Sequence, residues 1–166
     1  MELSDRVELE QPSKIRAAID GFLALGRIAV VGVSRADKDF SRGLFRELLK
    51  RGYDVVPVNP NAAEIEGRRC YARVQEIPAP VEGVLVMTPS EATPEVIQDC
   101  IDAGVDRVWM HKGAGVGAVN AEAVAMCKEH DISVVAGYCP FMFLPHTGFV
   151  HRIHRFFKKV GKTYPN

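Results

Sequence analysis

The residues best suited to bind a ligand lie in the turn after the first apolar run, residues 28–31. The turn begins Gly32-Val33-Ser34, and an amphipathic segment starts about eight residues later. A glycine turn that leads into a helix can present backbone N–H groups and a hydroxyl to a phosphate. The pattern therefore predicts a site for the phosphate of a nucleotide-type ligand.

Three basic side chains lie in this turn or just after it: Arg35, Lys38 and Arg42. Positive charges suit a ligand with several phosphates, and arginine can contact a phosphate through two parallel hydrogen bonds. A solvated, charged loop that binds nothing would show the same composition. The phosphate interpretation therefore needs support from a second position.

That second position follows the next apolar run, Asp54–Val58. Sites for NAD carry Asp or Glu at the end of the second strand, where the acid binds the ribose hydroxyls. This chain has Asn59 and then Pro60 there, and its first turn is not Gly-x-Gly-x-x-Gly. The missing acid disfavours an NAD dehydrogenase. An NADP-dependent oxidoreductase stays an alternative, with Arg35 or Lys38 on the 2′-phosphate.

Residues able to carry out catalysis are sparse. Cys139 follows the last apolar run and His146 lies seven residues on, so a thiol enzyme that uses Cys139 is a further alternative. His146, His151 and His154 have no acidic or cysteine partner at a spacing typical of a metal site. We therefore predict no catalytic residue and no metal site, and favour binding over catalysis.

The elements that would position these residues alternate along the chain. Short, Val-rich apolar runs predict parallel strands that are covered on both faces. The expected strands are residues 28–31, Asp54–Val58, 84–87, 107–110 and 132–136. The expected helices cover residues 13–25, a segment marked by Leu44, Leu48 and Leu49 that stops at Gly52, and residues 91–103, 118–130 and 148–160.

This alternation predicts an α/β fold with a doubly wound, Rossmann-type parallel sheet of five strands, in the order 3-2-1-4-5, and an added C-terminal helix. Ligands of such sheets bind at the carboxyl ends of the strands, where the strand order reverses. We expect one domain, with an N-terminal helix in residues 1–26, a core over 27–143 and a basic helical extension over 144–166.

Composition and charge argue against a membrane-spanning protein and a nucleic-acid-binding protein. The 166 residues are 47% hydrophobic and 25% charged, without an apolar run long enough to span a membrane or a signal-like start, so we expect a cytoplasmic protein. The net charge is zero, although residues 151–166 alone carry +5. Nucleic acid is therefore a poor candidate partner. Phe149, Phe156 and Phe157 suggest core packing or a homodimer contact.

Several segments together resemble the small stand-alone CoA-binding domain proteins. These are Rossmann-type domains similar to the N-terminal domain of the succinyl-CoA synthetase α-subunit. The resemblance covers about residues 22–143 and is most specific in Gly52-Tyr-Asp-Val-Val-Pro-Val-Asn-Pro60. The other segments that carry it are Gly32-Val-Ser34, Arg42, Ile65-x-Gly67, Arg69-Cys-Tyr71 and Ile77-Pro78.

The resemblance implies a site for CoA or acyl-CoA across the carboxyl edge of the sheet. The glycine turn would contact the pyrophosphate. The turn after the second strand would border the adenosine and its ribose phosphate, and the turn after the third strand would form the other wall of the site. An acid at Asn59 would repel the ribose 3′-phosphate. With Arg35 added from its place in the turn, the candidate residues are Gly32, Val33, Ser34, Arg35, Arg42, Asn59, Pro60, Tyr71, Thr88 and Pro89. We expect a non-catalytic carrier, sensor or regulatory module. The alternative thiol enzyme that uses Cys139 would then be CoA-linked.

Overall fold

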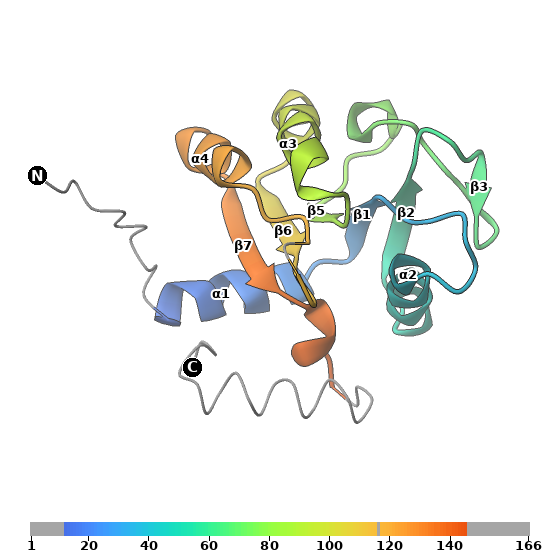
Figure 1. Ribbon diagram of the computed structural model, residues 1–166, viewed down its shortest axis with the longest axis horizontal. Helices are drawn as coiled ribbons and strands as arrows, with labels where there is room; N and C mark the ends of the chain where they lie inside the picture. Colours follow the sequence, from blue (N-terminus) through green and yellow to red (C-terminus); the bar gives the residue numbers. More distant parts are fainter. Residues whose placement is uncertain (1–11, 116, 146–166) are drawn as a thin grey trace, which may run out of the picture.

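A computed structural model describes residues 12–115 and 117–145 of the chain. Its layers are a central sheet with α3 and α4 on one face and α1 and α2 on the other (Figure 1). The main strands are β1 (Arg27–Val31), β2 (Asp54–Val58), β5 (Gly83–Val86), β6 (Arg107–His111) and β7 (Ser133–Tyr138). The helices are α1 (Pro12–Leu23), α2 (Phe40–Lys50), α3 (Thr93–Asp102) and α4 (Ala121–Glu129).

The five main strands are parallel and lie in the order β2-β1-β5-β6-β7, which confirms the expected doubly wound α/β class. One detail of the expected order is wrong, because the strand expected third, β5, pairs with β1 and not with the outer edge of β2. Tyr71 takes that outer place with a single parallel bridge to Val58. The order of the main strands therefore reverses between β1 and β5, which is where such folds bind ligands.

Alternation along β1 explains why this strand is apolar throughout. Ala29 and Val31 face the side covered by α3 and α4, whereas Ile28 and Val30 face α1 and α2. Both faces exclude water, so the strand has no polar side and reads as a continuous apolar run. This is the pattern from which the parallel sheet was predicted.

Trp109 and the four cysteines belong to the core. Trp109 in β6 is 0% exposed and its indole N–H donates to the carbonyl of Tyr138 at 2.9 Å, so its side chain packs within the sheet core. Every cysteine is buried as a thiol, and burial raises the pKa of Cys127 to about 11. The cysteines therefore pack as small hydrophobic residues.

Two of the helices begin at side-chain caps. Asp39 accepts from the backbone N–H of Ser41 at 2.8 Å at the start of α2. Asn120 accepts from the N–H of Ala123 at 3.1 Å, so α4 starts three residues later than the predicted 118. At the end of α2 the chain turns through Gly52, which has φ +88°, as predicted for a C-terminal glycine.

The sequence analysis missed the short elements between β2 and β5. The strands β3 (Glu64–Ile65) and β4 (Arg68–Arg69) form a hairpin of two residues each, followed by the 3₁₀ turn η1 (Val74–Glu76). The hairpin turn is Glu66-Gly67, and both residues have positive φ, 51° and 71°. Two consecutive positive φ values are typical of a type I′ hairpin turn.

The remaining 3₁₀ turns are η2 (Ser90–Ala92), just before α3, and η3 (Pro140–Met142), after β7. In the part of the chain that the structure describes, no helix has the length and apolar character needed to cross a membrane. The expected final helix over 148–160, its phenylalanines and basic residues, and His146, His151 and His154 lie outside the described residues.

Candidate functional site

The turns after β1 and β5 meet at the point where the strand order reverses. Gly32 has φ +90° and donates its N–H to the carbonyl of Val58 at 3.0 Å. A Cβ at this position would lie 2.9 Å from both the carbonyl carbon of Met87 and the backbone nitrogen of Thr88. Position 32 therefore requires glycine for its backbone angle and for its close approach to the β5 turn. The structure brings the predicted residues Gly32 and Thr88 together.

Asn59 attaches the β2 turn to the β1 turn. Its side-chain N–H donates to the carbonyl of Val33 at 2.8 Å, and its side-chain oxygen accepts from the N–H of Asn61 at 2.8 Å. Its backbone N–H donates to the carbonyl of Tyr71 at 2.9 Å. An acid at this position could not donate to Val33. The structure thus supplies a reason for the amide that is independent of any ligand.

Ser34 is engaged within its own loop. Its backbone N–H donates to the hydroxyl of Ser41 at 2.9 Å, and its hydroxyl oxygen accepts from the N–H of Ala36 at 3.0 Å. Ser41 in turn donates from its hydroxyl to Asp39 at 2.5 Å. These contacts connect the turn directly to the first residues of α2, so the loop and the helix start form one hydrogen-bonded unit.

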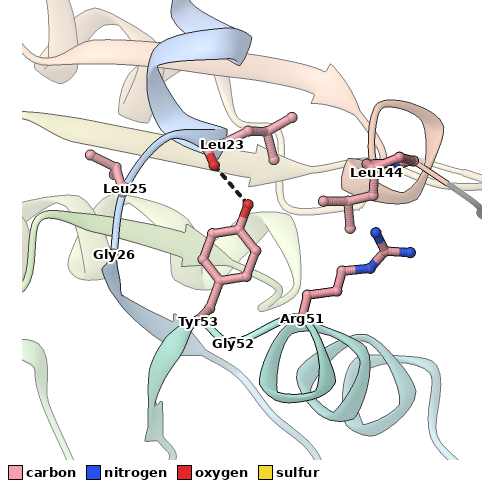
Figure 2. Close-up of a pocket in the computed structure, with 8 residues that line it drawn as sticks. Leu23, Leu25, Gly26, Arg51, Gly52, Tyr53 and Leu144 are labelled. Atoms are coloured by element: carbon pink, nitrogen blue, oxygen red, sulfur yellow. Dashed lines mark hydrogen bonds between the residues drawn. The ribbon is translucent and has the colours of Figure 1, made fainter.

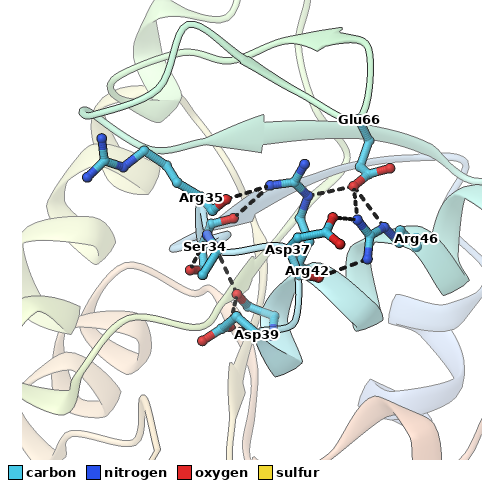
Figure 3. A network of polar contacts seen from close by, with 9 residues as sticks. Ser34, Arg35, Asp37, Asp39, Arg42, Arg46 and Glu66 are labelled. Carbon is cyan, nitrogen blue, oxygen red and sulfur yellow. Dashed lines mark hydrogen bonds and ion pairs between the residues drawn. The ribbon is translucent and has the colours of Figure 1, made fainter.

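Arg42, Arg46 and Glu66 form a cluster that we call the arginine clamp (Figure 3). The Nε atoms of Arg42 and Arg46 donate to the same oxygen of Glu66, at 2.6 and 2.8 Å. Arg46, and then Arg42, hold the pKa of Glu66 below its usual range. The clamp therefore joins α2 to the turn of the β3–β4 hairpin through a carboxylate that is ionised at neutral pH.

The same two arginines hold the carbonyl groups of the loop. Arg42 donates to the carbonyls of Ser34 at 3.1 Å and Arg35 at 3.2 Å, and Arg46 donates to the carbonyl of Asp37 at 2.9 Å. Arg46 also pairs with the carboxylate of Asp37. The guanidinium predicted to reach phosphate, that of Arg42, is thus bound to loop carbonyls and to Glu66.

Several predicted residues lie at the rim of the site. Arg35, Pro60 and Pro89 are exposed, and Figure 3 shows the side chain of Arg35 extending away from the clamp. Val33, by contrast, is 0% exposed, so its side chain supports the turn from within the core. Tyr71 is half-buried, and the guanidinium carbon of Arg69 lies 5.2 Å from the centre of its ring.

Neutral hydrogen bonds build the other side of the site. The hydroxyl of the buried Thr93 donates to the carbonyl of Ala118 at 2.7 Å and lies 3.5 Å from the hydroxyl of Thr88. Ser90 donates to the carbonyl of Val119 at 2.8 Å, and Asn120 donates to the carbonyl of Ser90 at 3.1 Å. The β5 turn is therefore attached to the segment that precedes α4.

Sequence reasoning missed three residues of this site: Ser41, Arg46 and Glu66. The Asp39-x-Ser41 pattern before an amphipathic segment is a helix-start signal, and it could have located Ser41. Arg46 follows Arg42 by four residues, which places both on one face of α2. Glu66 is the unspecified residue of Ile65-x-Gly67, and no local signal connects it to α2.

The alternative site, a Cys139–His146 pair of a thiol enzyme, gains no support from the geometry of the described residues. Cys139 is 1% exposed at the end of β7, and its suggested partner His146 lies outside the described residues. Among the described residues, no three His, Cys, Asp or Glu side chains are grouped so that they could hold a metal ion.

A cavity of about 420 Å³ lies at the opposite edge of the sheet, where Gly26 precedes β1 and Tyr53 precedes β2 (Figure 2). Its lining is mostly apolar, and the hydroxyl of Tyr53 donates to the carbonyl of Leu23 at 2.7 Å. Arg51, its charged residue, is paired with Glu47 at 2.8 Å. We favour the carboxyl edge as the ligand site, because there the glycine turn and the reversal of strand order coincide.

Comparison with known proteins identifies a family. The family profile described as a CoA binding domain matches residues 26–145. The uncharacterized protein YneT of Bacillus subtilis is 32% identical over 113 residues, which are 68% of this chain and 81% of that protein. An ADP-forming acetate–CoA ligase of Archaeoglobus fulgidus is 31% identical over 131 residues, covering 74% of this chain and 20% of the ligase.

Solved structures agree with the sequence relatives. A hypothetical protein from Pyrococcus horikoshii OT3 has a TM-score of 0.70 and 30% identity, over 84% of this chain and 94% of that one. The dinucleotide-forming acetyl-coenzyme A synthetase 1 of Ca. Korarchaeum cryptofilum has a TM-score of 0.58 and 31% identity, over 66% of this chain and 25% of that one. The chain thus spans nearly all of one small protein but a minor part of each of these two ligase-type enzymes.

Proposed function

The chain belongs to the CoA-binding domain family, and from this premise we propose that it binds coenzyme A or an acyl-CoA at the carboxyl edge of β1, β2 and β5. The observation that supports this most directly is the junction of Gly32 with Met87 and Thr88. The junction places a glycine turn and the start of α2 at the switch point of the sheet. Phosphates bind at such positions in other α/β folds.

Each wall of the site suits one part of the ligand. The loop after β1 lies beside the start of α2, where the dipole of the helix favours the negative charge of a pyrophosphate. Asn59, Pro60 and Tyr71 would border the adenosine and its ribose phosphate, with Arg35 exposed nearby. Thr88 and Pro89 would form the wall toward the pantetheine arm. Two candidate residues named from the sequence have no direct side-chain contact in this proposal: the side chain of Val33 is buried, and the guanidinium of Arg42 is bound to Glu66 and to loop carbonyls.

We propose a non-catalytic role as a carrier, sensor or regulatory module. The ADP-forming acetate–CoA ligase matches this chain over 20% of its length, so most of that enzyme has no counterpart here. Residues that act on the thioester would then lie outside the matched segment. We also expect a cytoplasmic protein, and homodimerisation remains a prediction that light scattering tests.

Calorimetry with the purified chain tests the proposed ligand. CoA is expected to bind at least ten times more tightly than NADP, the alternative cofactor, which the family comparisons do not support. Arg35→Ala should weaken CoA binding about threefold, as loss of one exposed charge contact would. A matched Arg16→Ala change on α1 should leave the affinity unchanged. Absence of heat with millimolar CoA, or preference for NADP, would contradict the proposal.

Mass spectrometry of the ligand released by denaturation addresses the acyl group. Protein purified without added ligand is expected to release CoA or an acyl-CoA, and the mass of the acyl group would identify the natural ligand. Release of a nicotinamide nucleotide would instead support the oxidoreductase alternative.

A further inference from the structure

The Nε and Nη1 donors of Arg42, and all three nitrogens of Arg46, are directed at the protein itself. Three carbonyl groups of the loop accept from them, those of Ser34, Arg35 and Asp37, at 2.9 to 3.2 Å. The Nε atom of each arginine donates to Glu66. A phosphate could recruit these donors only by breaking several charge-assisted bonds, which are about twice as strong as neutral ones.

The direction of the carbonyls determines the direction of the backbone N–H groups. In a planar trans peptide the C=O and the following N–H point in opposite directions. Holding the carbonyls of Ser34 and Asp37 toward α2 therefore turns the N–H groups of Arg35 and Lys38 away from it. Among residues 12–115 and 117–145, neither N–H has an intramolecular acceptor.

Glu66 couples this loop to a second element. It lies in the turn of the β3–β4 hairpin, and the side chains of Arg42 and Glu66 are only 15% and 22% exposed. The two arginines are balanced by two carboxylates, Glu66 and Asp37, so the cluster carries no net charge. A neutral cluster is poorly suited to attract phosphate by charge, but well suited to hold a loop in one shape.

We infer that the arginine clamp acts through the loop: Arg42, Arg46 and Glu66 are positioning residues that direct the backbone N–H groups of Arg35 and Lys38 at the phosphate oxygens of the ligand. This inference rests on the proposed function and replaces the direct contact expected for Arg42 with an indirect role. The loop is then an anion site made of backbone donors, and the arginines determine its shape.

Charge-conserving variants separate geometry from charge. Arg46→Lys retains the positive charge but cannot hold Asp37 and Glu66 together, and Glu66→Asp retains the negative charge on a side chain one methylene shorter. Arg51→Lys is the matched control, because Arg51 lies just past the other end of α2 and pairs with Glu47 at 2.8 Å. Calorimetry with CoA and with pantetheine, which has no phosphate, is combined with amide NMR of the ligand-free chain.

We expect Arg46→Lys and Glu66→Asp to weaken CoA binding about tenfold, corresponding to the loss of about one charge-assisted hydrogen bond. Pantetheine binding should not change. In the ligand-free chain, the amide resonances of residues 34–38 should shift and exchange faster with solvent. Arg51→Lys should bind CoA within twofold of wild type, with unchanged loop resonances.

Other outcomes would overturn the inference. Wild-type CoA affinity in both clamp variants, with or without shifted loop amides, would show that the clamp does not serve the ligand. Equal losses for CoA and pantetheine would show a general structural defect. If the wild-type chain itself bound no CoA, the proposed function would fail first, and the inference would fail with it. The ligand-free spectra show whether each variant is folded.

Discussion

The two walls of the candidate site are built with different chemistry. The charged wall consists of residues 32–39 together with Arg42, Arg46 and Glu66, and side-chain charges hold its backbone carbonyls. The neutral wall consists of residues 87–90 and 118–120 together with Thr93, and hydroxyl and amide groups hold it. Gly32 and Thr88 are where the two walls touch.

The charged and neutral walls should respond differently to solution conditions. Ion pairs respond to salt, to pH and to an approaching anion, whereas buried neutral hydrogen bonds respond little to any of them. Under the proposed function, the charged wall holds the loop that would meet the phosphates, and the neutral wall holds the opposite side of the site. Four predictions test the division, in order of their expected effect on the free energy of unfolding.

Gly32→Ala should have the largest effect, because it separates the walls. The new Cβ would meet backbone atoms of Met87 and Thr88 at 2.9 Å, and the position has φ +90°. We expect the free energy of unfolding, measured by urea denaturation, to fall by about 3 kcal/mol. Gly43→Ala is the control: Gly43 lies in α2, a Cβ there would meet nothing within 4 Å, and this change should stabilise the chain. Equal effects of the two variants would refute the role of the junction.

Asn59→Asp should destabilise the charged wall by about 2 kcal/mol, because a carboxylate would face the carbonyl of Val33 in place of a donor. The variant also separates the two explanations for the missing acid. If position 59 borders the ribose phosphate, CoA should lose more affinity than dephospho-CoA. An equal loss for both ligands would leave the contact with Val33 as the sufficient explanation.

Thr93→Val should lower the free energy of unfolding by about 1 kcal/mol, because the carbonyl of Ala118 in the neutral wall would lose its buried donor. The substitution keeps the branched shape of the side chain. The loss should be the same at low and high salt. A loss that shrinks as salt increases would contradict the proposed difference between the walls.

The smallest effect concerns pH and the charged wall. Because the arginines lower the folded pKa of Glu66, its ion pairs stabilise the chain above about pH 4.3, where an unperturbed glutamate titrates, and this stabilisation is lost as pH falls through the folded value. The difference in unfolding free energy between wild type and Glu66→Gln should thus shrink below about pH 4. A difference that does not change with pH across the acid range would contradict the role of the Glu66 charge.

Much of the fold followed from periodicity, because β1, β2 and β5 are short apolar runs buried on both faces. The strand with which β5 pairs could not be predicted, because the pairing of parallel strands depends on a long crossover that leaves no local pattern in the sequence. The predicted turn residues meet at the site because carboxyl ends of parallel strands share an edge. The clamp was not predictable, because Glu66 reaches Arg42 across 24 positions of the chain.

The turn of the β3–β4 hairpin has a consequence for how this sequence can change. Glu66 has φ 51°, a conformation that Asn or Gly adopts more easily than Glu. A sequence optimised for hairpin stability alone would replace Glu66 and lose the clamp. If the clamp serves the ligand as we infer, hairpin stability and ligand recognition favour different residues at position 66, which is a trade-off between stability and function.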